Sequence, residues 1–268
     1  SLLGGLSPDT PEHDQTESAS TTLSAEGPIQ RRFPRGAAAG TCLHSVFEDW
    51  DFHQCDPVVR DRVVETTLQR HGFDPGLAHG VGDWLQRVVD SPLDTKVGVC
   101  LSDLAPGQRV SELEFHYPVA ADSLAGVARL LKDQGAGSYR VGDGGTRLSG
   151  FMKGFIDLVF EFQGRFYLAD YKSNWLGSSA GDYGPEALTR EVDEAGYRLQ
   201  YLIYSVALCR YLRLRIPSFS HEQHFGGAYY LFLRGMGREG PVGHGVFFDR
   251  PKAEIIDQLD AYLGGRPV

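Results

Sequence analysis

Two apolar runs separated by a short break stand out in the middle of the chain. Residues 155–162 and 166–171 are rich in aromatic and β-branched side chains, and a Gln-Gly pair lies between them. Runs of this composition joined by a short, glycine-containing break are typical of a β-hairpin. We therefore predict two antiparallel strands with a turn at Gly164.

The rest of the pattern predicts helices and two more strands. Apolar residues recur every three or four positions in most flanking segments, which is typical of helices. They alternate with polar residues in one further segment and run almost unbroken in another, which is typical of strands. The predicted helices lie after an N-cap at Thr41 and over about 57–98, 123–132, 185–194, 197–215 and 251–263, and the predicted strands lie over 110–118 and 226–235. This mixture indicates an α/β domain with a helical insertion at about 57–98.

Charged side chains interrupt the predicted hairpin. Asp157 lies on the first strand, and Asp170 and Lys172 share one face of the second. Such groups on otherwise apolar strands are costly to bury unless they pair or hold a cation. Mg²⁺ is usually held by one or two carboxylates together with substrate phosphate, and a neighbouring lysine orients or deprotonates water. A solvated edge hairpin with an ordinary Asp–Lys pair would show the same D-x-K pattern, but the second carboxylate at Asp157 favours a metal-dependent nuclease site.

Other candidate residues also have plain structural explanations. His44 follows Leu43 on a predicted helix, where a packed or solvated histidine is common. Glu112 lies on the polar face of an alternating strand, which either faces water or brings a third acid beside the Asp157 strand. Gln200 and Tyr204 share a helix face at i and i+4 spacing, where an aromatic stripe is ordinarily core.

Four motifs, in order along the chain, resemble a known nuclease family. They are Gly-Phe-Ile-Asp157-Leu-Val-Phe, Tyr-Leu-Ala-Asp170-Tyr-Lys172-Ser-Asn-Trp, Tyr197-Arg-Leu-Gln200-Tyr-Leu-Ile-Tyr204 and His224-Phe-Gly-Gly-Ala-Tyr-Tyr-Leu-Phe-Leu-Arg-Gly. From about Arg32 to the end, the chain resembles the C-terminal nuclease domains of RecB subunits of exodeoxyribonuclease V (RecBCD), within the PD-(D/E)xK superfamily. The resemblance implies a restriction-endonuclease-like fold, a mixed central sheet flanked by helices, and Mg²⁺-dependent DNA cleavage.

The resemblance also implies roles for the candidates. Gly-Thr41-x-x-His44-x-x-Phe-Glu matches the family's N-terminal motif, in which the histidine is a metal ligand. The implied ligands are His44, Asp157, Asp170 and the main-chain carbonyl of Tyr171, with Lys172 positioning or activating water. Because imidazole favours Mn²⁺ somewhat, Mn²⁺ is expected to substitute for Mg²⁺.

The implied substrate contacts come from the predicted helix at 197–215. Gln200 and Tyr204 match the family's Q-x-x-x-Y motif and are expected to line the site. Tyr201 is a candidate for stacking on a base, as aromatic residues do in single-strand channels. Glu112 aligns with an acid found in family members. We expect it to orient one of the metal ligands more than to bind the ion itself.

The distribution of charge bears on how substrate reaches the site. The net charge is −9, and residues 1–30 hold five acidic residues without Lys or Arg, so residues 31–268 carry 26 basic against 35 − 5 = 30 acidic residues, or −4. A mildly acidic domain is poorly suited to non-specific duplex binding, so we expect another domain to deliver the strand. The polar composition of residues 1–30 predicts a flexible acidic linker, which in the resembled protein would tether the nuclease, residues 31–268, to a helicase.

Cysteine spacing and hydropathy limit the cofactors and the cellular location that the sequence predicts. Cys42, Cys55, Cys100 and Cys209 form no C-x-x-C pair and lack the closely spaced trio of cluster-binding relatives, so free thiols without an iron–sulfur cluster are expected. No apolar run approaches a membrane span, and the sequence begins without a signal pattern. With the resemblance, these features predict a bacterial cytoplasmic location at the nucleoid, without membrane contact.

The predicted function is a Mg²⁺-dependent DNA nuclease domain of a RecBCD-type helicase–nuclease. It would cut single strands delivered during double-strand-break repair and foreign DNA degradation. The implied partners are DNA, RecC, RecD, the helicase part of RecB, and RecA. Two alternatives stay open: a non-catalytic docking module for RecA or a partner subunit on a nuclease fold, and a stand-alone nuclease unrelated to any helicase.

Overall fold

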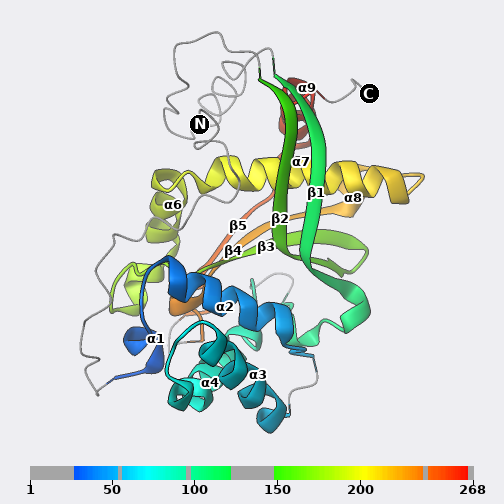
Figure 1. The fold of residues 1–268 in the computed structure, drawn as a ribbon. Helices are drawn as coiled ribbons and strands as arrows, with labels where there is room; N and C mark the ends of the chain where they lie inside the picture. The colour runs from blue at the N-terminus through cyan, green and yellow to red at the C-terminus, as the bar shows by residue number, and fades with distance from the viewer. Residues whose placement is uncertain (1–26, 54–55, 95–97, 122–147, 238–240, 265–268) are drawn as a thin grey trace.

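A single mixed sheet of five strands forms the centre of the molecule (Figure 1). The computed structural model describes residues 27–53, 56–94, 98–121, 148–237 and 241–264. The strands are β1 (Arg109–Ala121), β2 (Leu148–Phe162), β3 (Arg165–Lys172), β4 (Phe225–Phe232) and β5 (Val246–Asp249), in that order across the sheet. β3 and β4 are parallel and the other neighbours antiparallel. The predicted mixed α/β fold is therefore confirmed.

The predicted hairpin is present as β2 and β3. Gln163 and Gly164 form its turn, with positive φ angles of 52° and 76°. A two-residue turn with positive φ at both positions has the twist that antiparallel strands favour, and glycine adopts it without strain. The turn thus fixes the register in which Leu158 pairs with Ala169.

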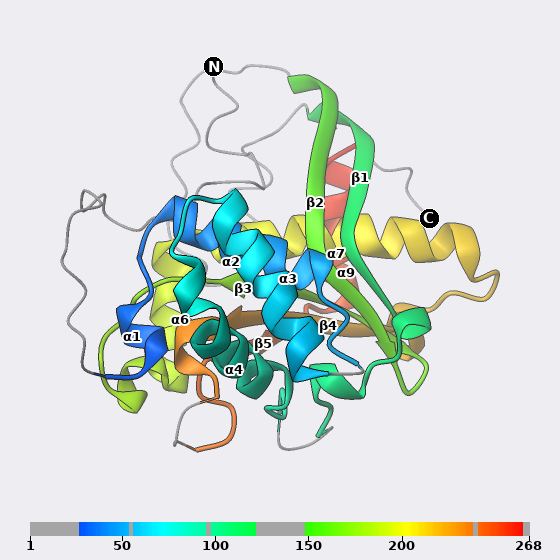
Figure 2. The same ribbon diagram turned by 60° about the horizontal axis from the view of Figure 1, so that its bottom comes forward.

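Helices cover both faces of the sheet (Figure 2). They are α1 (Ile29–Arg32), α2 (Ala37–Asp49), α3 (Pro57–Arg70), α4 (Ala78–Val89), α6 (Pro185–Glu194), α7 (Tyr197–Arg215), α8 (His221–His224) and α9 (Ala253–Tyr262), with short 3₁₀ turns η1 (Pro75–Leu77), η2 (Leu101–Asp103), η3 (Pro106–Gln108), η4 (Ala180–Tyr183) and η5 (Leu233–Gly235). One core cluster packs α2, α3 and α4 on the sheet, and another packs α6, α7 and α9 on its other side. Because both faces are covered, every residue of β4 is buried.

One sequence prediction is wrong, and others fall on residues that the structure does not describe. Thr41 was wrong as the N-cap of α2, because the helix begins at Ala37 after Gly36, which has a φ of 92°, and Thr41 Oγ1 donates to the Ala37 carbonyl (3.0 Å). The Ala-rich stretch ahead of Thr41 favours helix and extends it. The predicted helix at 123–132 and most of the predicted linker lie outside the described residues.

The sheet forks at Asp157. β2 pairs with β1 from Arg109↔Phe160 to Ala121↔Leu148, but its pairing with β3 ends at Leu158↔Ala169. Beyond that pair, β1 and β2 leave the sheet together as a two-stranded arm, which rises away from β3 in Figure 1. Among the residues that the structure describes, no strand therefore pairs with the backbone of β3 past Ala169 on its β2 side. In the described ranges, no helix is long and apolar enough to span a bilayer.

Candidate active site

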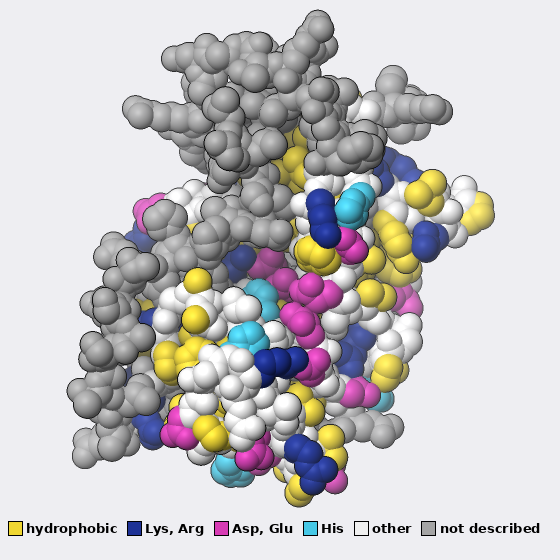
Figure 3. All heavy atoms as spheres, in the orientation of Figure 1, with side chains coloured by type: hydrophobic (Ala, Val, Ile, Leu, Met, Phe, Trp, Pro, Cys, Tyr) yellow, Lys and Arg dark blue, Asp and Glu magenta, His cyan; other side chains and the backbone are white. Residues whose placement is uncertain are grey.

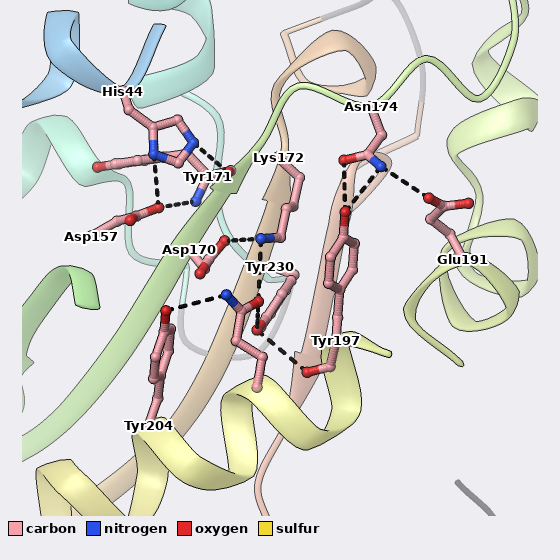
Figure 4. Close-up of polar contacts among 11 residues, drawn as sticks. His44, Asp157, Asp170, Tyr171, Lys172, Asn174, Glu191, Tyr197, Tyr204 and Tyr230 are labelled. Carbon is pink, nitrogen blue, oxygen red and sulfur yellow. Dashed lines mark hydrogen bonds and ion pairs between the residues drawn. The ribbon is translucent and has the colours of Figure 1, made fainter. Parts of the chain in front are cut away.

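Side chains form hydrogen bonds with the backbone groups of β3 that β2 does not pair with beyond the fork. The Tyr171 N–H donates to Asp157 Oδ2 (2.8 Å), and His44 Nε2 donates to the Tyr171 carbonyl oxygen (2.7 Å). His44 Nδ1 lies 3.4 Å from Asp157 Oδ2 (Figure 4). Because buried backbone groups need partners, these contacts explain why the strand stays ordered where its ladder ends. The sequence-predicted pair His44 and Asp157 is thus brought together around Tyr171.

Helix α2 holds His44 in place. Its neighbours Leu43 and Phe47 are buried against the sheet, and the Phe47 ring stacks on the Tyr171 ring with centroids 4.1 Å apart. His44 itself is partly exposed, with 25% of its side chain accessible. The packing of α2 therefore fixes the backbone while the imidazole remains accessible at the fork.

Asp170 and Lys172 form a buried ion pair on the face of β3 that meets α7. Lys172 Nζ lies 2.5 Å from Asp170 Oδ1, and their side chains are only 6% and 3% exposed. Lys172 Nζ also donates to Gln200 Oε1 (3.3 Å), and Gln200 Nε2 donates to the Tyr204 hydroxyl (3.2 Å). A chain of hydrogen bonds therefore connects Gln200 and Tyr204 to the Asp-x-Lys motif, and their contact with substrate stays a prediction.

The two carboxyl groups have different proton affinities. The pKa of Asp170 is raised to about 6, because burial and the nearby Asp157 charge together outweigh the lowering effect of Lys172. Burial would also raise the pKa of Asp157, but His44, Lys172 and the Tyr171 N–H together hold it below its ordinary value. Burial would lower the pKa of Lys172, but Asp170 and other neighbouring groups hold it above its ordinary value. The site thus combines a charged carboxylate with a second carboxyl that gives up its proton reluctantly, which favours an added cation.

The donors at the fork are of the types that a hard divalent cation takes. In the ranges the structure describes, no three His, Cys, Asp or Glu side chains already form a metal-holding group. The donor set here instead mixes side chains with the backbone, since the Tyr171 carbonyl lies within hydrogen-bond distance of His44. Carboxylate and carbonyl oxygens suit Mg²⁺, and an imidazole is compatible with Mn²⁺.

The structure places two other predicted residues differently. Tyr201 is not brought to the site, because its hydroxyl donates to Asp249 Oδ2 (2.6 Å) and its ring packs beside Phe247. Glu112 is exposed on β1, and the flanking pairs Ser111↔Leu158 and Leu113↔Ile156 place it across the ladder from Asp157. Its φ of 54° marks a kink in β1 at the fork. Glu112 is therefore beside the site, with its role still a prediction.

Sequence reasoning missed several residues that surround Lys172. Tyr230 is paired in register with Asp170 across the parallel strands β3 and β4, and its hydroxyl donates to Gln200 Oε1 (2.8 Å). Tyr197 lies beneath the Lys172 ammonium and is held by Asn174. Two signals in the sequence could have found them: Asn174 lies two residues after Lys172, and Tyr197 lies three residues before Gln200 on the same helix. The position of Tyr230 depends on the register of β4, which is set only in the folded sheet.

A further buried residue ties the N-terminal segment to this site. Arg234, fully buried, donates through Nε to the Ser173 carbonyl (2.7 Å) and through Nη1 to the carbonyls of Gln30 (2.7 Å) and Phe33 (3.1 Å). Its Nη2 donates to the Pro34 carbonyl. One guanidinium thus joins residues 30–34 to the end of β3.

The fold and the paired motifs define a class of protein. The chain belongs to the PD-(D/E)XK nuclease superfamily, whose family model matches residues 22–263. More particularly, it is homologous to the C-terminal region of RecB. It is 39% identical over 267 residues to RecBCD enzyme subunit RecB of Escherichia coli (strain K12), a match that covers 97% of this chain and 22% of that protein.

Other relatives carry the same name. The chain is 36% identical over 233 residues to RecBCD enzyme subunit RecB of Haemophilus influenzae, covering 85% of this chain and 18% of that protein. It is 34% identical over 265 residues to the subunit of Mycobacterium tuberculosis, covering 86% of this chain and 24% of that protein. The chain spans about a fifth of the length of these relatives.

Proposed function

We propose that this chain is the Mg²⁺-dependent DNA nuclease domain of a RecBCD-type helicase–nuclease. The observation that carries the proposal is the fork, where β2 leaves β3 and Asp157, His44 and the Tyr171 backbone meet beside the Asp170–Lys172 pair. Retention of both carboxylates and the lysine supports cleavage over a purely docking role, because a docking surface has no need of a buried ion pair at this position.

Each residue at the fork has a part in the proposed chemistry. The residues that would hold the cation are His44, Asp157, Asp170 and the Tyr171 carbonyl. A bound divalent cation supplies Lewis acidity at the scissile phosphate and lowers the pKa of a bound water. For His44 Nε2 to serve as a ligand, the imidazole proton must sit on Nδ1, where Asp157 Oδ2 is 3.4 Å away to accept it.

Lys172, Gln200 and Tyr204 act on the substrate side. The Lys172 ammonium orients the attacking water and offsets the negative charge that develops on the phosphate. Gln200 Oε1 accepts a hydrogen bond from that ammonium, and Gln200 Nε2 donates one to the Tyr204 hydroxyl. In this proposal the Gln200 amide and the Tyr204 hydroxyl present donors to phosphate oxygens beside the scissile bond.

Surface charge supports delivery of the strand by another part of a larger enzyme. Asp and Glu side chains gather with His where α2 meets the base of the β1–β2 arm (Figure 3). Such a surface repels phosphate unless cations neutralise it. We propose that the helicase part of RecB feeds a single strand to this face, with residues 1–30 as tether, RecC and RecD as partner subunits, and a cytoplasmic location at the nucleoid. RecA docking is a separate proposal, tested by pull-down with a cleavage-dead variant.

The direct test measures cleavage of a labelled single-stranded oligonucleotide in Mg²⁺. Asp170→Asn and Lys172→Met should each lower kcat by a factor of about 10² or more while the circular dichroism spectrum stays native. Tyr201→Phe, which removes a hydroxyl outside the fork, is the control and should cut as the wild type does. Wild-type cleavage by either fork variant would refute the assignment.

A further inference from the structure

The ammonium group of Lys172 is enclosed on several sides. Besides Asp170 Oδ1 and Gln200 Oε1, two aromatic rings face it. Lys172 Nζ lies 4.2 Å from the centroid of the Tyr197 ring and 5.1 Å from that of the Tyr230 ring. Both distances fall within the range in which the face of an aromatic ring attracts a cation. The ammonium therefore lies between a carboxylate, an amide oxygen and two ring faces.

The Tyr197 ring is itself fixed by a hydrogen-bonded chain. Asn174 Nδ2 donates to the Tyr197 hydroxyl (3.0 Å) and to Glu191 Oε1 (3.0 Å) on α6. Asn174 is 3% exposed and lies two residues after Lys172, on the segment that leaves β3. The segment that carries the lysine thus also holds, through Asn174, the ring that the lysine contacts (Figure 4).

The Tyr230 hydroxyl sets the orientation of Gln200. It donates to Gln200 Oε1 at 2.8 Å, so that oxygen receives hydrogen bonds from both Tyr230 and Lys172 while the amide nitrogen faces Tyr204. A flipped amide would direct its N–H₂ group at the Tyr230 hydroxyl and the Lys172 ammonium, which donates only. Tyr230 is fully buried, which keeps its hydroxyl in place.

We infer that Tyr197 and Tyr230 are positioning residues that form an aromatic cage for Lys172. A lysine side chain has many rotamers, and its ammonium must stay in one place to act on a single phosphate. The cage restricts those rotamers before substrate arrives. This inference rests on the function proposed above, because it assigns the two tyrosines to the same site, and it goes further by naming what holds the lysine in place.

The decisive comparison is between Tyr230→Phe and Tyr229→Phe. Tyr229 is the next residue of β4, faces the opposite side of the sheet, is fully buried and donates its hydroxyl to Asp94 Oδ2 (2.7 Å). Each variant keeps its ring and loses one buried hydroxyl, so the two should lose similar stability. We expect Tyr230→Phe to lower kcat about tenfold with KM and Mg²⁺ affinity unchanged, and Tyr229→Phe to leave all three unchanged. Because Tyr230→Phe keeps the ring and removes the hydroxyl, equal kcat values would refute the role of the Tyr230 hydroxyl in positioning Lys172 through Gln200.

A second measurement needs no activity. The chain has only five lysines, so their side-chain NMR signals are few. The Lys172 ε-protons, beside the Tyr197 and Tyr230 rings, should show an upfield ring-current shift that Tyr197→Leu reduces and Tyr197→Phe retains. An unshifted Lys172 signal in the wild type would refute the cage.

The two proposals fail in different ways. If the wild type does not cut DNA in Mg²⁺, the proposed function fails, and the NMR shift still decides whether the cage exists. If the wild type cuts and Asp170→Asn does not, but Tyr230→Phe matches Tyr229→Phe, the nuclease stands and the positioning of Lys172 by the Tyr230 hydroxyl through Gln200 is refuted.

Discussion

The buried carboxyl group of Asp170 should make the stability of the metal-free chain fall as pH rises. Its pKa in the folded state is raised from 3.8 to about 6 by burial. A folded state that holds a proton more tightly than the unfolded state loses stability when that proton is removed. The contribution is therefore fully present below pH 3.8 and is lost once the pH passes about 6. Asp170→Asn removes this titration and keeps the size of the side chain.

The size of the effect follows from the shift. A change of about 2 pKa units corresponds to about 3 kcal/mol of unfolding free energy. Other carboxyl groups titrate in the same range, but they are shared by wild type and variant and so largely cancel in the difference. Because the unfolded chain is already partly ionised at pH 4, most but not all of this change falls above that pH. The free energy of unfolding of Asp170→Asn relative to wild type should thus rise by about 2 kcal/mol between pH 4 and pH 7.5.

The assay is urea unfolding in the presence of a chelator, followed by circular dichroism at several pH values. Mg²⁺ at a hundred times its dissociation constant should then stabilise the wild type at pH 7.5 by about 2.7 kcal/mol and the variant far less. A difference between the two proteins that stays flat from pH 4 to pH 7.5 would refute the reasoning, because it would mean that Asp170 titrates alike in the folded and unfolded chains.

Substitutions at three other residues test other parts of the structure. His44→Gln should weaken Mn²⁺ binding about 10- to 100-fold by calorimetry without changing the fold, and unchanged affinity would remove His44 from the ligand set. Arg234→Met should lower the free energy of unfolding by about 3 kcal/mol or more, and Arg234→Lys should recover only part of it, because one ammonium cannot span two backbone segments. Tyr201→Phe should lower it by about 1 kcal/mol and leave single-strand affinity unchanged in an anisotropy titration, whereas weaker DNA binding would show that the Tyr201 hydroxyl contributes to strand binding.

The local chemistry of the site could be predicted from the sequence because it depends on neighbours along the chain. Alternation along a strand places Asp170 and Lys172 on one face, and helical spacing places Gln200 and Tyr204 on one face. Tyr201 shows the limit of such reasoning. One residue on a helix is a rotation of about 100°, so the neighbour of Gln200 faces Asp249 instead of the lysine.

The contacts that depend on strand register could not be predicted. That Tyr230 lies opposite Asp170 follows from the parallel pairing of β3 with β4, and these strands are separated by more than fifty residues that include α6 and α7. The fork at Asp157 could not be predicted from the sequence either, because the apolar pattern of β2 is that of one continuous strand. These features arise from the packing of distant segments, which hydrophobic periodicity does not encode.

The four carbonyl oxygens gathered by Arg234 bear on where this domain can be trimmed for expression. Three of them belong to Gln30, Phe33 and Pro34, ahead of the first long helix, and the fourth to Ser173, next to Lys172. A version started after Pro34 would take three of these four carbonyl acceptors away from a buried cation beside the candidate site. Working boundaries should therefore begin no later than Pro28, even though the motifs themselves start only at Gly40.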